Sequence, residues 1–262
     1  MTTDKIISRR NGPVAHLVFN NPEKHNAMSV EMWKSVEHHL NDFIADRTTR
    51  VIVLSGEGGK AFVSGADISE FDSARASLET IEHYDALTTR VYDLLYSAAK
   101  PTVAMIQGYC IGGGVALAAC CDIRICTDDS RFAIPAAKLG LGYGYTGLRR
   151  LVDLVGPAFT KELFFTARQF TALEANAMGL VNRVVSVDEL LPYVTEYVSA
   201  IAGNAPLTVT SVKQIIGEIT KDTIERDIEV CESLVKACFD SEDYIEGRRA
   251  FKQKRKPAFN GH

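Results

Sequence analysis

The sequence predicts an α/β fold followed by a helical region at the carboxyl end. Short apolar runs alternate with stretches of helical periodicity up to about Cys126, and the pattern after about Gly156 is almost entirely helical. Alternating strands and helices are typical of α/β architecture. The 262 residues are 46% apolar and 24% charged, which suits one large globular domain with or without an appendage.

Five apolar runs have the length and composition of strands. The first, VAHLVFN, is closed by Asn20 and Pro22, two residues that end strands. The second, VIVLS, runs into the glycine-rich turn GEGG. The predicted strands are residues 14–20, 51–55, 61–63, 102–107 and 123–126.

Helical periodicity is clearest at residues 29–46, where Ser29 is the expected N-cap. The buried stripe of this helix is formed by Met32, Trp33, Val36, Leu40 and Phe43. Residues 80–98 and 113–121 are also expected to be helical. After Gly156 the predicted helices are residues 159–165, 171–178, 187–202, 206–219 and 224–239, and residues 255–262 are expected to be extended.

Composition excludes several classes of protein. The net charge of −4 gives no reason to expect a nucleic acid or an acidic membrane as partner. No run approaches the roughly 18 apolar residues of a membrane span, and the first residues lack the apolar core of a signal peptide, so we expect a cytoplasmic protein. The six cysteines contain no CxxC pair and are expected to fill the core, not to bind metal or form disulfides.

Two glycine-rich segments are the candidates for chemistry. They are GGKAFVSGADI at residues 58–68 and GYCIGGG at residues 108–114, and neither matches a P-loop or a dinucleotide-binding pattern. Each is a simple tight turn on the plainest interpretation. However, Gly112–Gly113–Gly114 opens an apolar helix, whose first backbone N–H groups have no partner within the helix. A second amide from the SerGlyAla turn would complete a pair of donors for an oxygen that gains negative charge.

These segments resemble the crotonase (enoyl-CoA hydratase/isomerase) superfamily. The resemblance is carried by GGKAFVSGADI, GYCIGGGVALAACCDIRI and AFKQKRKPAF, together with NPEKHNAMS at residues 21–29 and ARQFTALEANAMGLVNRVV at residues 167–185. It implies a spiral of ββα units with a C-terminal helical trimerisation region. The expected division is a core with the acyl-CoA site at residues 1–200 and a helical oligomerisation region at residues 201–262, in a homotrimer or homohexamer.

The resemblance also implies site residues. The amides of Ala66 and Gly113 would form the oxyanion hole for an acyl-CoA thioester, and no separate cofactor or metal is expected because CoA is part of the substrate. Phe251 and Lys254 would reach the nucleotide end of CoA, often that of a neighbouring subunit; a solvated basic tail is the alternative for this segment. The remaining substrate contacts are expected from two loops, at Lys24, His25, Ala27, Ser64, Asp67 and Ile68.

The chain departs from the family at the acid–base positions. Hydratases of the family carry two glutamates there, and isomerases carry a glutamate or an aspartate. These positions match Ala116, Ala136 and Gly144, so no carboxylate is present to move a proton there. Tyr143 matches a tyrosine of methylmalonyl-CoA decarboxylase-like members, the closest resemblance, although those have His where this chain has Ala66. Packing on a glycine-rich loop is the alternative role for Tyr143.

The sequence therefore supports three hypotheses. The first is a carbon–carbon lyase of the decarboxylase kind, in which loss of CO2 leaves an enolate for the oxyanion hole. The second is an enoyl-CoA hydratase or isomerase with other acid and base residues. The third is a catalytically silent CoA-binding assembly subunit.

A few polar residues have open roles. Asp67 is expected to stabilise its turn and Asp122 to be structural, while His16 packs or faces solvent. Arg149 and Arg150 would pair either with phosphate or with acidic residues.

Overall fold

The structure is a computed structural model, and it describes residues 3–67 and 78–262. Its strands form two sheets, which confirms the α/β class. The larger sheet has the order β1-β2-β3-β5-β7-β10, in which only the β1–β2 pair is antiparallel. Its strands are Ile6–Asn11, Val14–Phe19, Val51–Gly56, Thr102–Ile106, Ile123–Thr127 and Arg183–Val185, named in that spatial order.

The smaller sheet has the order β4-β6-β8-β9. Its strands are Ala61–Val63, Tyr109–Ile111, Arg131–Ala133 and Phe170–Thr171. Consecutive strands alternate between the sheets, because β3, β5 and β7 lie in the larger one while β4, β6 and β8 lie in the smaller one. The chain thus winds through the two sheets three times, and each turn places a new loop at the carboxyl end of the smaller sheet.

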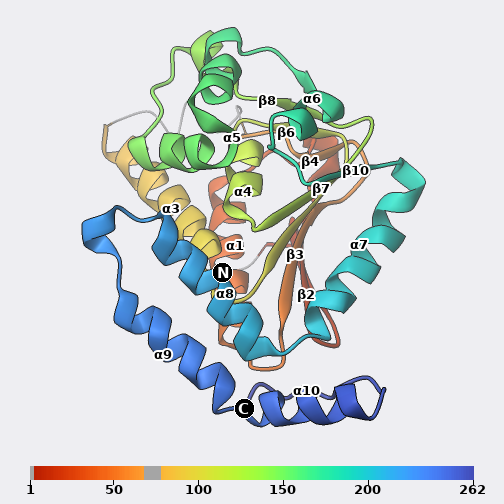
Figure 1. The fold of residues 1–262 in the computed structure, drawn as a ribbon. Helices are drawn as coiled ribbons and strands as arrows, with labels where there is room; N and C mark the ends of the chain where they lie inside the picture. The colour runs from red at the N-terminus through yellow and green to blue at the C-terminus, as the bar shows by residue number, and fades with distance from the viewer. Residues whose placement is uncertain (1–2, 68–77) are drawn as a thin grey trace.

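Helices cover both faces of the larger sheet (Figure 1). On one face, Val51 and Val53 of β3 pack in a cluster with residues of α7 (Val187–Ala202). On the other face, Ile52 and Leu54 join the main core, which includes residues of α1 (Val30–Ala45), α3 (Leu78–Ser97) and α4 (Gly113–Cys120). This alternation along β3 is the period-two pattern of a strand buried on both sides.

Helix α1 confirms the sequence prediction in detail. The Ser29 hydroxyl accepts a hydrogen bond from the Met32 amide and caps the helix. The five predicted stripe residues are all buried, and Ser35 is buried beside them.

The carboxyl-terminal helices form an arm that consists of α8 (Pro206–Thr220), the short 3-10 turn η4 (Thr223–Glu225), α9 (Ile228–Phe239) and α10 (Glu242–Lys252). The arm begins against the core with α8 and ends with α10 at the bottom of Figure 1. No residue of α9 is buried in the single chain. Large apolar side chains are exposed along the arm, among them Val212, Ile216, Ile219, Ile224, Ile228, Val235, Phe239 and Ile245.

Some predicted boundaries were wrong. The segment expected to be a glycine turn after β5 contains the strand β6, and the strands β1, β8, β9 and β10 were not predicted. Helix α5 (Tyr145–Thr166) begins well before the predicted residue 159. Gly156, with φ +75, interrupts it beside Pro157, and this break obscures the helical periodicity.

Cysteines behave largely as expected. All six are free thiols, and Cys110, Cys120, Cys121 and Cys126 are buried, whereas Cys231 and Cys238 on α9 are only half-buried. Separately, no helix within the described residues is both long and apolar enough to cross a bilayer.

Candidate active site

The two glycine turns lie side by side. Strands β4 and β6 are parallel neighbours, with Ala61 opposite Tyr109, so the segments that follow them leave from the same edge of the smaller sheet. A Cβ built on Gly113 would lie 3.9 Å from the Gly65 Cα, which shows how closely the turns approach.

Backbone pairing determines where the Ala66 amide points. Ala66 forms a parallel bridge with Met28, in which the Met28 amide donates to the Gly65 oxygen (2.8 Å) and the Asp67 amide donates to the Met28 oxygen (3.0 Å). In such a pair the amide of the bridged residue itself points away from its partner. The Ala66 N–H therefore faces away from Met28 and donates to no other atom among the described residues.

Gly113 supplies the second amide. It is the first residue of α4, so its N–H has no acceptor within the helix and lies at the positive end of the helix dipole. Within the described part of the chain this amide also has no hydrogen-bond acceptor. Two adjacent amides without partners are the arrangement that stabilises an oxygen carrying negative charge.

Different structural constraints require glycine at the two positions that flank Gly113. Gly112 has φ +55, a left-handed conformation that favours glycine. A Cβ on Gly114 would lie 2.2 Å from the Val63 oxygen, so only glycine lets α4 approach β4 this closely. Gly113 has neither constraint, because among the described residues its Cβ would meet nothing nearer than the Tyr92 hydroxyl at 3.4 Å. The absence of a side chain there leaves the amide open to a ligand.

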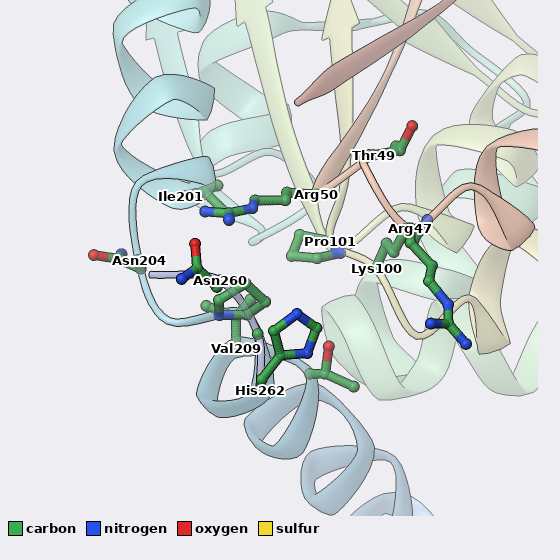
Figure 2. Close-up of a pocket in the computed structure, with 13 residues that line it drawn as sticks. Arg47, Thr49, Arg50, Lys100, Pro101, Ile201, Asn204, Val209, Asn260 and His262 are labelled. Carbon is green, nitrogen blue, oxygen red and sulfur yellow. The ribbon is translucent and has the colours of Figure 1, made fainter. Parts of the chain in front are cut away.

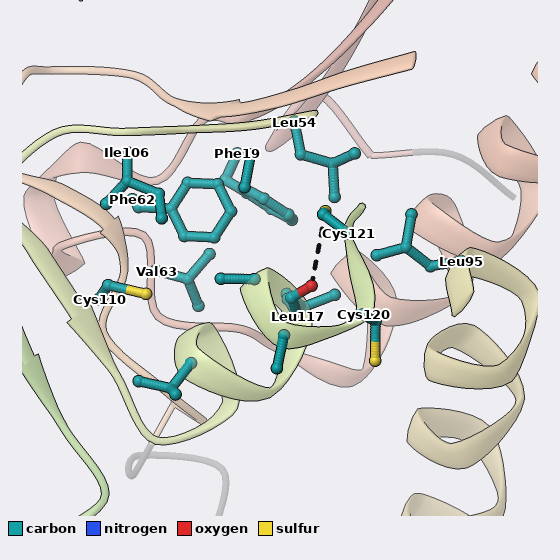
Figure 3. Packing of buried hydrophobic residues seen from close by; sticks show 14 of the residues in the cluster. Phe19, Leu54, Phe62, Val63, Leu95, Ile106, Cys110, Leu117, Cys120 and Cys121 are labelled. Carbon is teal, nitrogen blue, oxygen red and sulfur yellow. Dashed lines mark hydrogen bonds between the residues drawn. The ribbon is translucent and has the colours of Figure 1, made fainter. Parts of the chain in front are cut away.

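A buried arginine holds the other end of α4. The Arg124 guanidinium, on β7, donates hydrogen bonds to the carbonyl oxygens of Ala118, Cys121 and Leu180. Cations near the last carbonyls of a helix stabilise it. Figure 3 shows Leu117, Cys120 and Cys121 of this segment among the core side chains, with the Cys121 thiol directed at the Leu117 oxygen. The helix that presents Gly113 is thus anchored by packing and by this cap.

The predicted CoA loop lies against the SerGlyAla turn. Lys24, in the 3-10 turn η1 (Pro22–Lys24), forms an ion pair with Asp67 at 2.7 Å, and Asp67 is buried. The Ser64 amide donates to the His25 oxygen at 3.2 Å. His25 also packs its ring edge-on against Tyr109, with centroids 6.1 Å apart. Asp67 therefore joins two segments, in agreement with its expected structural role.

Asn26, which the sequence prediction did not include, holds this loop in place. It is fully buried, and its side-chain amide donates to the oxygens of Glu57 and Ala61 while its side-chain oxygen accepts from the Asn21 amide. Ala27, the remaining predicted loop residue, is buried and its oxygen accepts from the Asn21 side chain. Ile68 lies outside the described residues.

Tyr143 lies on the loop between the 3-10 turn η3 (Pro135–Leu139) and α5. Its ring packs edge-on against Phe164, with centroids 4.7 Å apart, and a Cβ on Gly147 would come within 2.9 Å of it. Burial, followed by the nearby Cys120 thiol, raises the pKa of Tyr143 to about 12. At neutral pH the group is therefore a phenol that can donate a hydrogen bond or a proton, not a base.

Tyr92 on α3 is a site residue that the sequence reasoning missed. Its hydroxyl lies beside Gly113, and its ring packs edge-on against Trp33 at a centroid separation of 5.4 Å. Burial raises the pKa of Tyr92 well above its usual range, with smaller contributions from Tyr143 and Tyr84. The helical periodicity of this segment indicated only which residues pack, so nothing in the sequence distinguished Tyr92 from a core residue.

Comparison with known proteins identifies the family. Residues 9–262 match the family described as Enoyl-CoA hydratase/isomerase. The chain belongs to this family. It is 34% identical to a crotonyl-CoA hydratase of Syntrophomonas wolfei subsp. wolfei, covering 99% of both chains. It is also 34% identical to a short-chain-enoyl-CoA hydratase of Clostridium acetobutylicum, covering 98% of this chain and 97% of that one.

The fold is the crotonase fold that the resemblance predicts. A crystal structure of an enoyl-CoA hydratase/carnithine racemase from Magnetospirillum magneticum superimposes with a TM-score of 0.95 and 36% identity, covering 100% of this chain and 97% of that one. The curated relatives described above are hydratases. They give no support to a closer resemblance to methylmalonyl-CoA decarboxylases.

The resemblance matches Ala116, Ala136 and Gly144 to carboxylate positions of the family, and the structure places the three as follows. Ala116 is one turn into α4, and its amide donates to the Gly112 oxygen at 3.2 Å. Ala136 is buried in η3, which follows β8, the next parallel neighbour of β6. Gly144 is exposed at the N-cap of α5, where an added Cβ would touch no described residue within 4 Å.

Other predicted residues lie away from this family site. Phe251 is 88% exposed near the end of α10, and Lys254 follows that helix; Figure 1 shows α10 at the opposite end of the molecule from β4 and β6. Within one chain they do not reach the glycine turns.

The remaining polar candidates have structural partners. Arg150 pairs with Asp93 at 2.6 Å and Arg149 with Asp222 at 3.2 Å, so both arginines take acidic partners. The Asp122 carboxylate accepts from Thr102 and pairs with Lys213. His16 is half-buried on β2 with a pKa lowered by burial and then by Arg9.

A pocket of about 370 Å³ lies at the amino ends of β3 and β5 (Figure 2). Its lining includes Arg47, Arg50, Lys100 and His262. Arg50 donates to the oxygens of Ala202 and Phe259, and Lys100 donates to those of Phe43 and Asp46, so two of these cations are engaged by backbone carbonyls. The pocket is separate from the family site, since the glycine turns follow β4 and β6.

Among the described residues, His38, His39 and Asp42 on α1 form a group whose ligand atoms lie within 4.8 Å of one another. His38 and Asp42 are exposed and their side chains pair at 3.4 Å. The group is on the outer side of α1 and has no contact with the glycine turns.

Proposed function

We propose that this protein is an enzyme that acts on an acyl-CoA thioester and stabilises negative charge on the thioester oxygen between the Ala66 and Gly113 amides. The observation that carries the proposal is the meeting of the two turns, each with an amide that has no described acceptor. Removal of one such donor from an oxyanion hole typically costs about 100- to 1,000-fold in rate.

The similarity to known hydratases supports hydration or isomerisation of an enoyl-CoA as the reaction. The two relatives named above are hydratases, and they support this alternative better than the decarboxylase hypothesis. Because Ala116 and Ala136 cannot move protons, the neutral phenol of Tyr143 would give its proton to the α carbon and regain one from the water whose oxygen adds to the β carbon.

Decarboxylation is a second candidate, favoured by the lack of a carboxylate at Ala116, Ala136 and Gly144. The bond between the α carbon and the substrate carboxylate would break, and its electron pair would pass into the thioester enolate as CO2 leaves. The Tyr143 phenol would then return a proton to the α carbon. This route needs no side-chain base, and a pocket without carboxylates would not repel the substrate's own carboxylate.

The CoA portion is proposed to lie along the loop of Lys24, His25 and Ala27 and beside Ser64. Phe251 and Lys254 would meet its nucleotide end from a neighbouring subunit, since they are far from the turns of their own chain. A homotrimer or homohexamer built through α8, α9 and α10 would also cover the apolar side chains exposed there.

The test measures the hydration of crotonyl-CoA and the release of CO2 from methylmalonyl-CoA by the purified protein. We expect turnover of at least one thioester, with a large loss of rate in Tyr143→Phe. Hydration without CO2 release would select the first reaction, and CO2 release without hydration would select the second. If the protein binds CoA thioesters but turns over neither substrate, it is a silent assembly subunit and the proposal is wrong.

A further inference from the structure

Two tyrosine hydroxyls in the site have no hydrogen-bond partner among the described residues, although both side chains are largely surrounded by protein. Neither Tyr92 nor Tyr143 makes a side-chain hydrogen bond with any described residue. Both side chains are half-buried. Among the described residues, Ser35 Oγ is the one solvent-inaccessible side-chain nitrogen or oxygen atom that lacks a hydrogen-bond partner, so neither phenol oxygen is in that class. The two phenol oxygens must therefore be reachable by water.

The two tyrosines come from different elements, and the Tyr92 hydroxyl lies beside the oxyanion turns. Tyr92 Oη lies 3.4 Å from the position of a Cβ on Gly113, next to the amide that is proposed to hold the thioester oxygen. Tyr92 and Tyr143 interact electrostatically, and the Cys120 thiol acts on both. Trp33 supports the ring of Tyr92 and Phe164 supports that of Tyr143, so neither phenol can swing freely.

The surroundings keep both groups protonated and hence able to donate. The side chains around them are aromatic rings and a thiol, and the nearby Arg150 is already paired with Asp93. A hydrocarbon acyl chain placed here would displace water from two donors without replacing its hydrogen bonds, which weakens binding. An acyl group with an oxygen acceptor would satisfy them.

Resting on the proposed function, we propose that this site selects thioesters whose acyl group carries an oxygen acceptor close to the thioester, with the Tyr92 hydroxyl as a hydrogen-bond donor to it. The acceptor would be a keto, hydroxyl or carboxylate oxygen. Tyr92, on α3, is thus a specificity-determining residue. Tyr143 is its neighbour from the loop before α5.

Binding affinities test this inference without any need for turnover. Calorimetric titrations would compare acetoacetyl-CoA and methylmalonyl-CoA with butyryl-CoA for the wild type, Tyr92→Phe and Tyr96→Phe. Tyr96 is a matched control, because it lies one turn along α3 with its ring under Arg150, where phenylalanine keeps the contact. The wild type and the control should prefer an oxygen-bearing thioester by about tenfold or more, and Tyr92→Phe should lose most of this preference.

The outcomes separate this inference from the proposed function. Equal binding of butyryl-CoA and both oxygen-bearing thioesters, or an unchanged preference in Tyr92→Phe, would overturn the inference and leave the proposed function intact. Failure of all three thioesters to bind would overturn both. Tyr92→Phe should unfold at the wild-type temperature, because its hydroxyl has no described partner to lose, so a misfolded variant would be recognised.

Discussion

At the residue scale, the glycines at the start of α4 differ in role: one is required by the packing, and another is proposed to serve the site. Gly114 is required by its contact with Val63, whereas Gly113 leaves a space that a methyl group would fit. The sequence showed three glycines in a row and could not distinguish them, because the distinction depends on which neighbour each one approaches.

Gly113→Ala should separate activity from stability. A methyl group beside the amide would obstruct the thioester oxygen, and we expect turnover to fall about 100-fold or more. The free energy of unfolding should change by less than about 1 kcal/mol, since alanine favours a helix and its Cβ makes no close contact. Steady-state kinetics and denaturant unfolding measure the two effects.

The matched control is Gly114→Ala. Its Cβ would lie 2.2 Å from the Val63 oxygen, so this variant should be destabilised by about 1–3 kcal/mol. Wild-type turnover in Gly113→Ala would show that its amide does not contact the reacting oxygen.

Tyr143 should also contribute to the pH dependence of stability. The unfolded chain releases the phenolic proton near its usual pKa of about 10, whereas burial raises the pKa in the folded protein to about 12. The contribution of Tyr143 to the free energy of unfolding is fully present below pH 10. It is lost as the pH rises towards 12, because the unfolded state then binds fewer protons than the folded state. The midpoint of urea unfolding should therefore fall less between pH 9 and 11 in Tyr143→Phe than in the wild type; an equal fall would contradict the burial of this phenol.

At the element scale, the parallel smaller sheet is what assembles the site. Three loops leave the carboxyl ends of β4, β6 and β8, and they carry Ala66, Gly113 and Ala136. All three strands have only three residues, which is too short for a reliable periodicity. The sequence predicted β4 as an apolar run, but it did not predict β6 or β8. The adjacency of the turns followed from the resemblance and not from the local pattern.

Arg124→Met tests the anchoring of α4. The substitution would leave the buried oxygens of Ala118, Cys121 and Leu180 without this donor, and we expect a loss of about 3 kcal/mol in the free energy of unfolding. Arg131→Met, on β8, is the control, because Arg131 donates only to local carbonyls and its loss should cost less than about 0.5 kcal/mol. Equal effects in denaturant unfolding would show that the cap does not hold the helix.

At the scale of the whole molecule, two features of the single chain bear on the proposed oligomer. The arm exposes apolar side chains on three helices, and Phe251 and Lys254 lie far from the site to which the resemblance assigns them. The proposed homotrimer or homohexamer would account for both features if the arm of one subunit lies against its neighbour. Helical periodicity predicted α8 and α9 but not α10 (Glu242–Lys252). The placement of these helices depends on contacts that local sequence does not encode.

Sedimentation should therefore give a mass of three or six chains of 28.7 kDa. The double substitution Ile216→Asp and Ile228→Asp places charges on the exposed apolar side of the arm and should shift the protein to smaller species. Leu173→Asp, at an exposed apolar residue of α6 (Ala172–Ala177), should leave the mass unchanged. A monomeric wild type would contradict the proposed role of the arm.

The central claim is that Ala66 and Gly113 hold the oxygen of an acyl-CoA thioester, and a crystal structure with a bound CoA thioester tests it most directly. We predict the thioester oxygen within about 2.7–3.2 Å of both amide nitrogens, with the acyl group beside Tyr92 and Tyr143. A thioester bound in the basic pocket at the amino ends of β3 and β5, or with its oxygen turned away from both amides, would contradict it.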